Sequence, residues 1–99
     1  MSDDANDGRY VNRGQQHLIK AVEALAADPF GGTDLETIQD AAGCSRDQAY
    51  RAVRNLIHAG WAEQAPNGGW RVTPRAAYVS DRVRRAMADE HRRFFGGAP

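Results

Sequence analysis

The chain has 99 residues, of which 41% are hydrophobic and 26% are charged. This length suits one soluble domain with a modest core and excludes two such domains. No apolar run approaches the roughly 18 residues that cross a bilayer, and a single cysteine excludes an internal disulfide. The first residues, MSDDANDG, are acidic and polar, unlike a secretory signal, so we expect a cytoplasmic protein without a membrane partner.

The formal net charge is zero, but the charges are unevenly distributed. Residues 1–43 carry 3 basic and 8 acidic side chains, a balance of −5, whereas residues 44–99 carry 10 arginines and 5 acids, a balance of +5. Every basic residue except Lys20 is an arginine, the side chain best shaped to contact phosphate or guanine. This asymmetry favours a polyanionic partner, although many neutral domains share it by chance.

The N-terminal part predicts a tail followed by a helix. Residues 1–10 have almost no apolar content and are expected to form a disordered acidic tail. From Asn12 to about Ala27, apolar residues recur with helical spacing and predict a core-facing stripe: Leu18, Ile19, Val22, Leu25 and Ala26. The proline and glycines of residues 28–32 then end the helix.

A second, shorter helix is predicted after this break. Thr33 and Glu36 have the spacing of a capping box, with Thr33 as the N-cap. The helix is expected to end at Gly43 and to bury one apolar face: Leu35, Ile38, Ala41 and Ala42. Cys44 lies in the following turn, where we interpret it as a small buried residue. The alternative is a reactive thiol whose pKa is lowered by the next helix N-terminus.

Ser45 and Gln48 form a second capping box, and the helix that they begin runs to about Ala59, with Gly60 as a left-handed stop. Its predicted core face contains Ala49, Ala52, Val53, Leu56 and Ile57. Two capped helices joined by so short a turn must cross steeply, which is the helix-turn-helix arrangement.

Residues 61–65 and 70–73 alternate apolar and polar side chains around an Asn-Gly turn at Asn67 and Gly68, which predicts a β-hairpin. Pro74 can open a final helix over residues 75–95, before a disordered end at 96–99. The predicted fold is therefore mainly α (α+β): a winged helix-turn-helix at residues 11–74, with three helices and a hairpin wing, plus one C-terminal helix. Trp61 and Trp70 are expected to pack on the core, and stacking on bases is the alternative.

The face of the third helix that lies opposite its core stripe is polar. It combines Asp47, Gln48, Arg51, Arg54, Asn55 and His58. Arginine recognises guanine in the major groove of DNA, and Asn or Gln recognises adenine. Arg46 and Tyr50 lie at the margins of this face, where they and the helix N-terminus at Ser45 would contact phosphates. The alternative is the solvated face of an ordinary surface helix, but the helix-turn-helix pattern favours double-stranded DNA as the partner.

The predicted wing offers three further contacts with DNA. Gly68 lets the backbone approach a phosphate closely beside Asn67, and Arg71 could reach the backbone or the minor groove. A plain hairpin turn without a role in binding is an equally good interpretation.

Several segments together resemble the DNA-binding domain of IclR-type bacterial transcription regulators: VNRGQQHLIKAVEAL (11–25), LETIQDAAG (35–43), AYR (49–51), GWAE (60–63) and WRVT (70–73). The resemblance covers about residues 11–75 and implies a DNA-binding transcription regulator. Two differences are notable. The large effector-binding domain of that family has no counterpart, so no small-molecule effector is implied, and Ser45 replaces the family's usual proline before the recognition helix.

The C-terminal helix carries one apolar stripe: Ala76, Val79, Val83, Ala86, Met87 and Phe94, interrupted by Glu90. We expect Val79, Val83, Met87 and Phe94 to form a homodimer interface, because winged helices commonly bind two-fold-related half-sites. The alternative is that the helix folds back across the first helix of its own subunit. A rival hypothesis for the whole chain is a protein-interaction module without a DNA role, which docks on a larger assembly through this helix.

Chemistry of other kinds has little support in the sequence. His17, His58 and His91 lie in three separate segments without the spacing of metal ligands, and one cysteine cannot complete a zinc site. No phosphate-binding loop, carboxylate pair or nucleophile arrangement stands out. We therefore expect neither an enzyme nor a cofactor.

Overall fold

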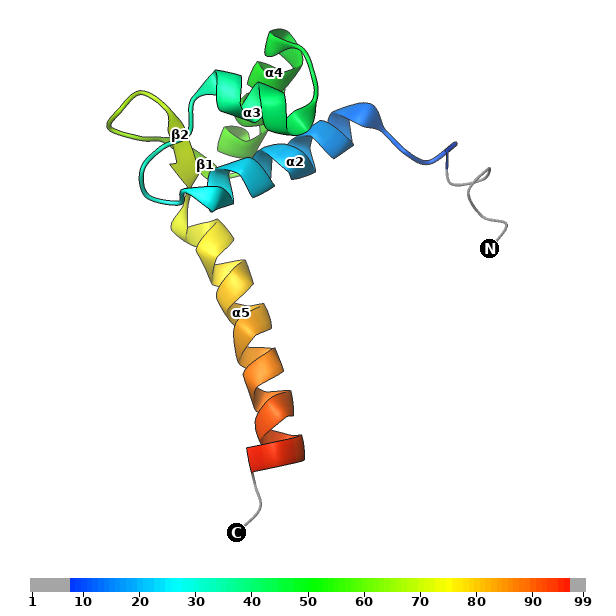
Figure 1. Ribbon diagram of the computed structural model, residues 1–99, viewed down its shortest axis with the longest axis vertical. Coiled ribbons are helices and arrows are strands. Elements are labelled where there is room, and N and C mark those ends of the chain that lie inside the picture. The colour runs from blue at the N-terminus through cyan, green and yellow to red at the C-terminus, as the bar shows by residue number, and fades with distance from the viewer. Residues whose placement is uncertain (1–7, 97–99) are drawn as a thin grey trace.

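The computed structural model describes residues 8–96 (Figure 1). Its elements in chain order are α2 (Arg13–Ala27), α3 (Leu35–Ala42), α4 (Arg46–His58), β1 (Ala62–Gln64), β2 (Trp70–Val72), α5 (Pro74–His91) and a π-helical turn, η1 (Arg92–Gly96). The chain is mainly helical with a small antiparallel sheet, as predicted, and this order is compatible with a winged helix. Of the two tails predicted to be disordered, residues 1–7 and 97–99 lie outside the described part, residues 8–10 form an exposed turn, and Gly96 belongs to η1.

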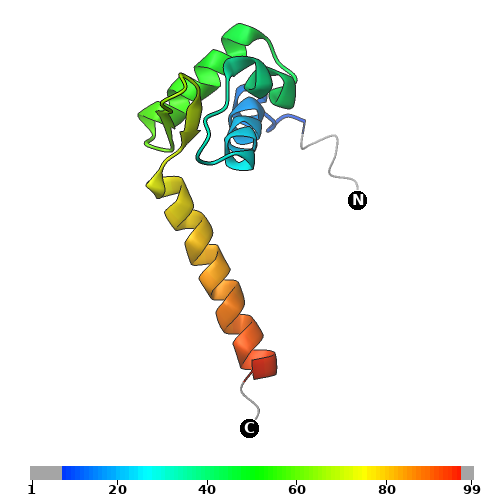
Figure 2. The same ribbon diagram turned by 60° about the vertical axis from the view of Figure 1, so that its left-hand side comes forward.

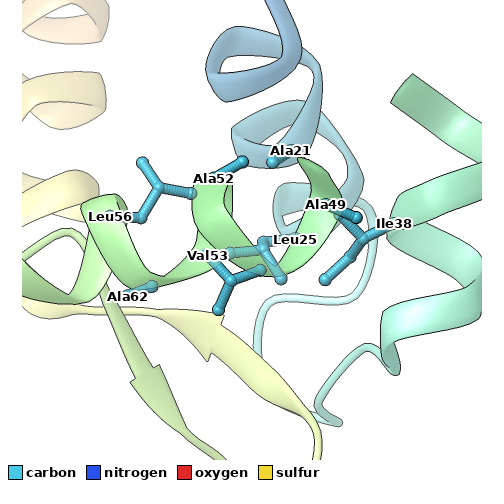
Figure 3. Packing of buried hydrophobic residues seen from close by; sticks show 8 residues of the cluster. All are labelled: Ala21, Leu25, Ile38, Ala49, Ala52, Val53, Leu56 and Ala62. Carbon is cyan, nitrogen blue, oxygen red and sulfur yellow. The ribbon is translucent and has the colours of Figure 1, made fainter. Parts of the chain in front are cut away.

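Residues 13–73, here called the body, form one core in which α2, α3 and α4 all pack against one another. Figure 3 shows the buried side chains converging from these helices and from β1: Ala21, Leu25, Ile38, Ala49, Ala52, Val53, Leu56 and Ala62. Four of them come from α4. The inner face of α4 is therefore held by the core, and only its outer face is free to bind a partner.

The buried face of α2 differs from the predicted stripe. Ala21 and Leu25 are fully buried, whereas Ile19 is 55% exposed and Ala26 is exposed as well. Because α3 and α4 both pack against α2, the buried face is centred between these two neighbours. The small Ala21 lies at this centre, which an apolar stripe in the sequence does not reveal.

Helix α3 begins one residue later than predicted. Asp34 is the N-cap, and its Oδ1 accepts a hydrogen bond from the backbone N–H of Thr37 at 2.9 Å. Thr33 is buried and pairs with Trp70 instead: its N–H donates to the Trp70 carbonyl at 2.7 Å, and its carbonyl accepts from the Trp70 N–H at 2.9 Å. The backbone of Thr33 thus belongs to the sheet. Ala41, predicted to be buried, is exposed, while Ala42 is buried.

The predicted limits of α4 are confirmed. The Ser45 Oγ accepts from the Gln48 N–H at 3.1 Å, and the Gln48 Oε1 accepts from the Ser45 N–H at 3.0 Å, so both halves of the capping box are present. Gly43 and Gly60 have φ angles of 63° and 81°, the left-handed conformation expected of residues that follow a helix. Short local signals were sufficient here because each cap is formed by neighbours in the sequence.

The wing is a short hairpin in which Ala62 pairs with Val72, Glu63 with Arg71, and Gln64 with Trp70. Thr33 adds a single bridge on the other side of Trp70, which attaches the hairpin to the loop between α2 and α3. A Cβ at Gly69 would lie 2.7 Å from the Thr33 carbonyl oxygen, so this close approach requires glycine. The turn end of the wing is therefore attached to the loop between α2 and α3.

Helix α5 leaves the body and extends away from it in both views (Figures 1 and 2). Its main contact with the body is through β2, and none of its residues is buried. Thr73 fixes the start of the helix by donating its hydroxyl to the Gly60 carbonyl at 2.6 Å. The alternative that this helix folds back across α2 is wrong. Within residues 8–96, no helix is both long and apolar enough to cross a membrane.

Candidate nucleic-acid interface

The outer face of α4 forms an exposed ridge between two clefts. Asp47, Arg51, Arg54 and His58 follow one another along the helix at intervals of three or four residues, and all four side chains are exposed. The other α4 positions predicted to contact DNA, Ser45, Arg46, Gln48, Tyr50 and Asn55, are exposed as well. The structure thus brings the predicted recognition residues together on one surface.

Two of the arginines on this ridge differ in their surroundings. The Arg51 guanidinium forms an ion pair with Asp47 one turn earlier, at 2.8 Å, although both side chains are more than 70% exposed. Arg54 forms no ion pair with any residue that the structure describes. Arg54 is therefore free to meet a phosphate or a base, whereas Arg51 is oriented by a carboxylate that could itself accept from cytosine.

The two amide side chains of α4 are partly engaged within the helix. The Gln48 Oε1 accepts the capping hydrogen bond from Ser45, and the Asn55 Nδ2 donates to the Arg51 carbonyl at 2.8 Å. Recognition of adenine by Asn or Gln uses both amide atoms. Each engaged atom keeps one further position, because an amide oxygen has two lone pairs and an amide nitrogen two hydrogens, so a paired contact with adenine would have to share an atom with these internal bonds.

One cleft separates α4 from the wing. It has a volume of about 680 Å³ and is lined by Asp34 and Leu35 at the start of α3, by Arg46, Asp47 and Tyr50 of α4, and by residues 67–70 of the wing. The Tyr50 and Trp70 rings meet edge to face with centroids 6.5 Å apart, which fixes the distance between helix and wing. Hydrogen bonds from Thr37 lower the pKa of Asp34. A carboxylate thus occupies the N-terminus of α3, and Arg46 is the group in this cleft that suits a phosphate.

The second cleft lies between α4 and the start of α2. Arg13 and His17 from α2 face Gln48, Arg51 and Asn55 across it. The sequence analysis did not predict Arg13 or His17 as DNA contacts. Their spacing of four residues places them on one side of α2, but nothing in the sequence indicates that α2 crosses α4 at this point.

The predicted wing contacts are largely used within the protein. The Asn67 Nδ2 donates to the carbonyls of Gly31 and Gly32 at 2.6 and 3.3 Å, and its Oδ1 accepts from the Gly69 N–H at 2.9 Å. Arg71 forms an ion pair with Glu63 across the hairpin at 2.9 Å. Gly68 remains exposed at the tip. Asn67 and Arg71 therefore stabilise the wing, and a role in binding would require them to break these bonds.

The remaining sequence candidates have structural roles. Cys44 is half-buried and packs against the core, and burial raises the pKa of its thiol, which is opposite to the change that would activate it. Trp61 and Trp70 both pack against the core, as predicted. Residues 8–96 contain no group of three His, Cys, Asp or Glu side chains that could hold a metal ion.

The chain was compared with models of protein families, with curated proteins and with solved structures, and none of the three comparisons gave a significant match.

Proposed function

We propose that the chain is a sequence-specific regulator that binds double-stranded DNA and inserts α4 into the major groove. The observation that carries the proposal is the ridge of α4, which holds arginines along its crest and has a further arginine in each flanking cleft. A helix with side chains is about 10–12 Å wide, and the major groove is about 12 Å wide. A ridge with a cleft on either side suits a groove bordered by two phosphate backbones.

Each part of this surface has a separate role in the proposal. Arg51 and Arg54 lie on the crest and would read guanine. Arg46 in the wing cleft and Arg13 in the α2 cleft would contact the two backbones, one on each side of the groove. Because Gln48 and Asn55 are each partly engaged, specificity would rest mainly on the arginines.

Binding to random duplex DNA at several salt concentrations tests the electrostatic part of the proposal. Arginines that replace condensed cations make affinity fall steeply with salt. About 4–6 phosphate contacts per subunit correspond to a log–log slope of roughly −4 to −5. Fluorescence anisotropy with a labelled duplex measures this slope, and a nearly flat response would contradict the proposal.

A matched pair of arginine variants tests the role of α4. On a site selected from random DNA, Arg51→Ala should lower affinity by about 5- to 150-fold, because one base contact is lost. Arg84→Ala removes the same charge from α5, where Arg84 pairs with Asp81 at 2.7 Å, and should change affinity little. Equal losses in the two variants would indicate a general charge effect and would remove α4 from its proposed role.

The second candidate is a protein-interaction module that docks through α5. It is favoured by the exposed apolar side chains of that helix and by the zero net charge of the chain. A flat salt response on DNA, together with equal behaviour of the two arginine variants, would favour this candidate.

A further inference from the structure

The apolar stripe of α5 has no partner within the body. Val83, Met87 and Phe94 are 56%, 68% and 68% exposed, and Val79 is 42% exposed. A helix of 18 residues is marginally stable in water on its own and usually gains its stability from packing. In the structure, the contacts of α5 with residues 8–73 are made mainly by its start with β2. Within residues 8–96 no other element covers this stripe, which leaves it open to a partner from outside.

The spacing of the stripe indicates the shape of that partner. Within the stripe, Ala76, Val79, Val83 and Ala86, followed by Glu90, lie at intervals of three, four, three and four residues, the heptad pattern of helices that pack side by side. Met87 and Phe94 lie at the edge of this seam. Such a seam fits another straight helix with the same spacing. We propose that this helix is α5 of a second copy, and that the two run antiparallel.

The direction follows from the charges at the two ends of the seam. Parallel pairing would place Glu90 beside Glu90 of the second copy, an unfavourable contact between like charges. Antiparallel pairing brings Glu90 to the N-terminal end of the other helix, next to its first turn. That turn has no side-chain cap, and Arg75 within it forms no ion pair with any described residue. A carboxylate is favourable both at a helix N-terminus and beside an arginine.

One register pairs all the apolar positions of the seam. With Val79 opposite Val83 of the second copy, Ala76 lies opposite Ala86, and four apolar layers form without a charged residue among them. A shift by one whole heptad, seven residues, toward the C-terminus would place Val79 opposite Glu90. The seam is short, so we expect weak association. The six arginines and three acids of residues 74–96 also give each helix a charge of +3, which opposes pairing at low salt.

The mass of the full-length protein in solution tests the pairing. At moderate salt, the mass determined by sedimentation should approach twice the 10.9 kDa of one chain as the protein concentration rises. Val83→Asp should remain monomeric, because pairing would bury a carboxylate without a partner. Ala88→Asp, on the opposite side of α5, should pair like the wild type. The fluorescence of Trp61 and Trp70 would show that the body is folded in each variant. A monomeric wild type, or a Val83→Asp protein that still pairs, would overturn the proposal.

A distance measurement tests the direction. The substitution Cys44→Ser removes the native cysteine, and Phe95→Cys then provides a single site for a spin label. This site lies far from the centre of the antiparallel pair. At 1.5 Å per residue, the two labels should be about 40 Å apart, compared with about 20 Å or less in a parallel pair. The shorter distance would overturn the antiparallel arrangement. None of these measurements involves DNA, so their outcome is separate from that of the binding experiments.

Discussion

Leu25, Ile38 and Val53 in the body are fully buried, whereas Val83 and Met87 of α5 are more than half exposed. The two regions have comparable apolar patterns in the sequence but opposite environments in the structure. The body buries its own stripes, since three short helices and a hairpin enclose them. The stripe of α5 remains exposed because the helix leaves the body after Thr73. An apolar stripe predicts that a surface will be covered, but it does not identify the segment that covers it.

The largest expected effect is the difference in stability between a variant that loses a buried side chain of the body and a variant that loses an exposed side chain of α5. Leu25→Ala should lower the free energy of unfolding by about 2–5 kcal/mol, because it leaves a cavity between α2, α3 and α4. Met87→Ala should change the unfolding of the body by less than about 0.5 kcal/mol. Urea denaturation followed by tryptophan fluorescence measures both, since Trp61 and Trp70 lie in the body. Similar losses in the two variants would show that α5 packs on the body after all.

The features that the sequence predicted correctly are those formed by neighbouring residues. The capping box of Ser45 and Gln48 and the left-handed glycines at 43 and 60 depend on residues one to four positions apart. They fixed the limits of α4 and hence the residues on its outer face. The mainly helical order with a small hairpin followed from the same signals.

The features that the sequence could not give depend on contacts between distant segments. Thr33 has the spacing of an N-cap, but its backbone pairs with Trp70, 37 positions later, and the cap passes to Asp34. Asn67 suits a phosphate contact by residue type, yet the nearby carbonyls of Gly31 and Gly32 already occupy its amide. The position of Arg13 beside α4 likewise depends on how α2 crosses it.

The N-terminal caps of α4 and α5 sharpen the comparison between body and α5. Helix α4 has a complete capping box, whereas Thr73 provides no side-chain cap to α5. Gln48 lies on the predicted recognition face, but it also forms half of this capping box. Gln48→Ala should therefore lower the free energy of unfolding of the body by about 0.5 kcal/mol, the lower end of the range for a lost helix cap. Denaturation curves of this variant and of the wild type measure the loss.

Gln48→Glu separates the two roles of this side chain. Glutamate keeps the reciprocal acceptor of the capping box, so stability should be retained. The new negative charge on the outer face of α4 should still weaken binding to DNA, because it faces the phosphates. If Gln48→Glu were as unstable as Gln48→Ala, the hydrogen bond to Ser45 would not contribute to the stability of α4.

The smallest expected effect is a dependence on pH that differs between the two regions. The pKa of Asp34 is lowered by hydrogen bonds from the Thr37 side chain and backbone, and the pKa of Asp81 in α5 is lowered chiefly by the hydrogen bond from Arg84. A carboxylate with a lowered pKa stabilises the folded state above its unfolded pKa, and this contribution is lost as the pH falls below about 4.

Asp34→Asn retains an oxygen for the cap but cannot titrate, so it should reduce the loss of body stability in acid. Asp81→Asn should leave the acid response of the body unchanged, since α5 does not contribute to the core. Denaturation of the three proteins at neutral and acid pH, followed by tryptophan fluorescence, compares them. An equal effect of the two substitutions would mean that the body and α5 unfold as one unit.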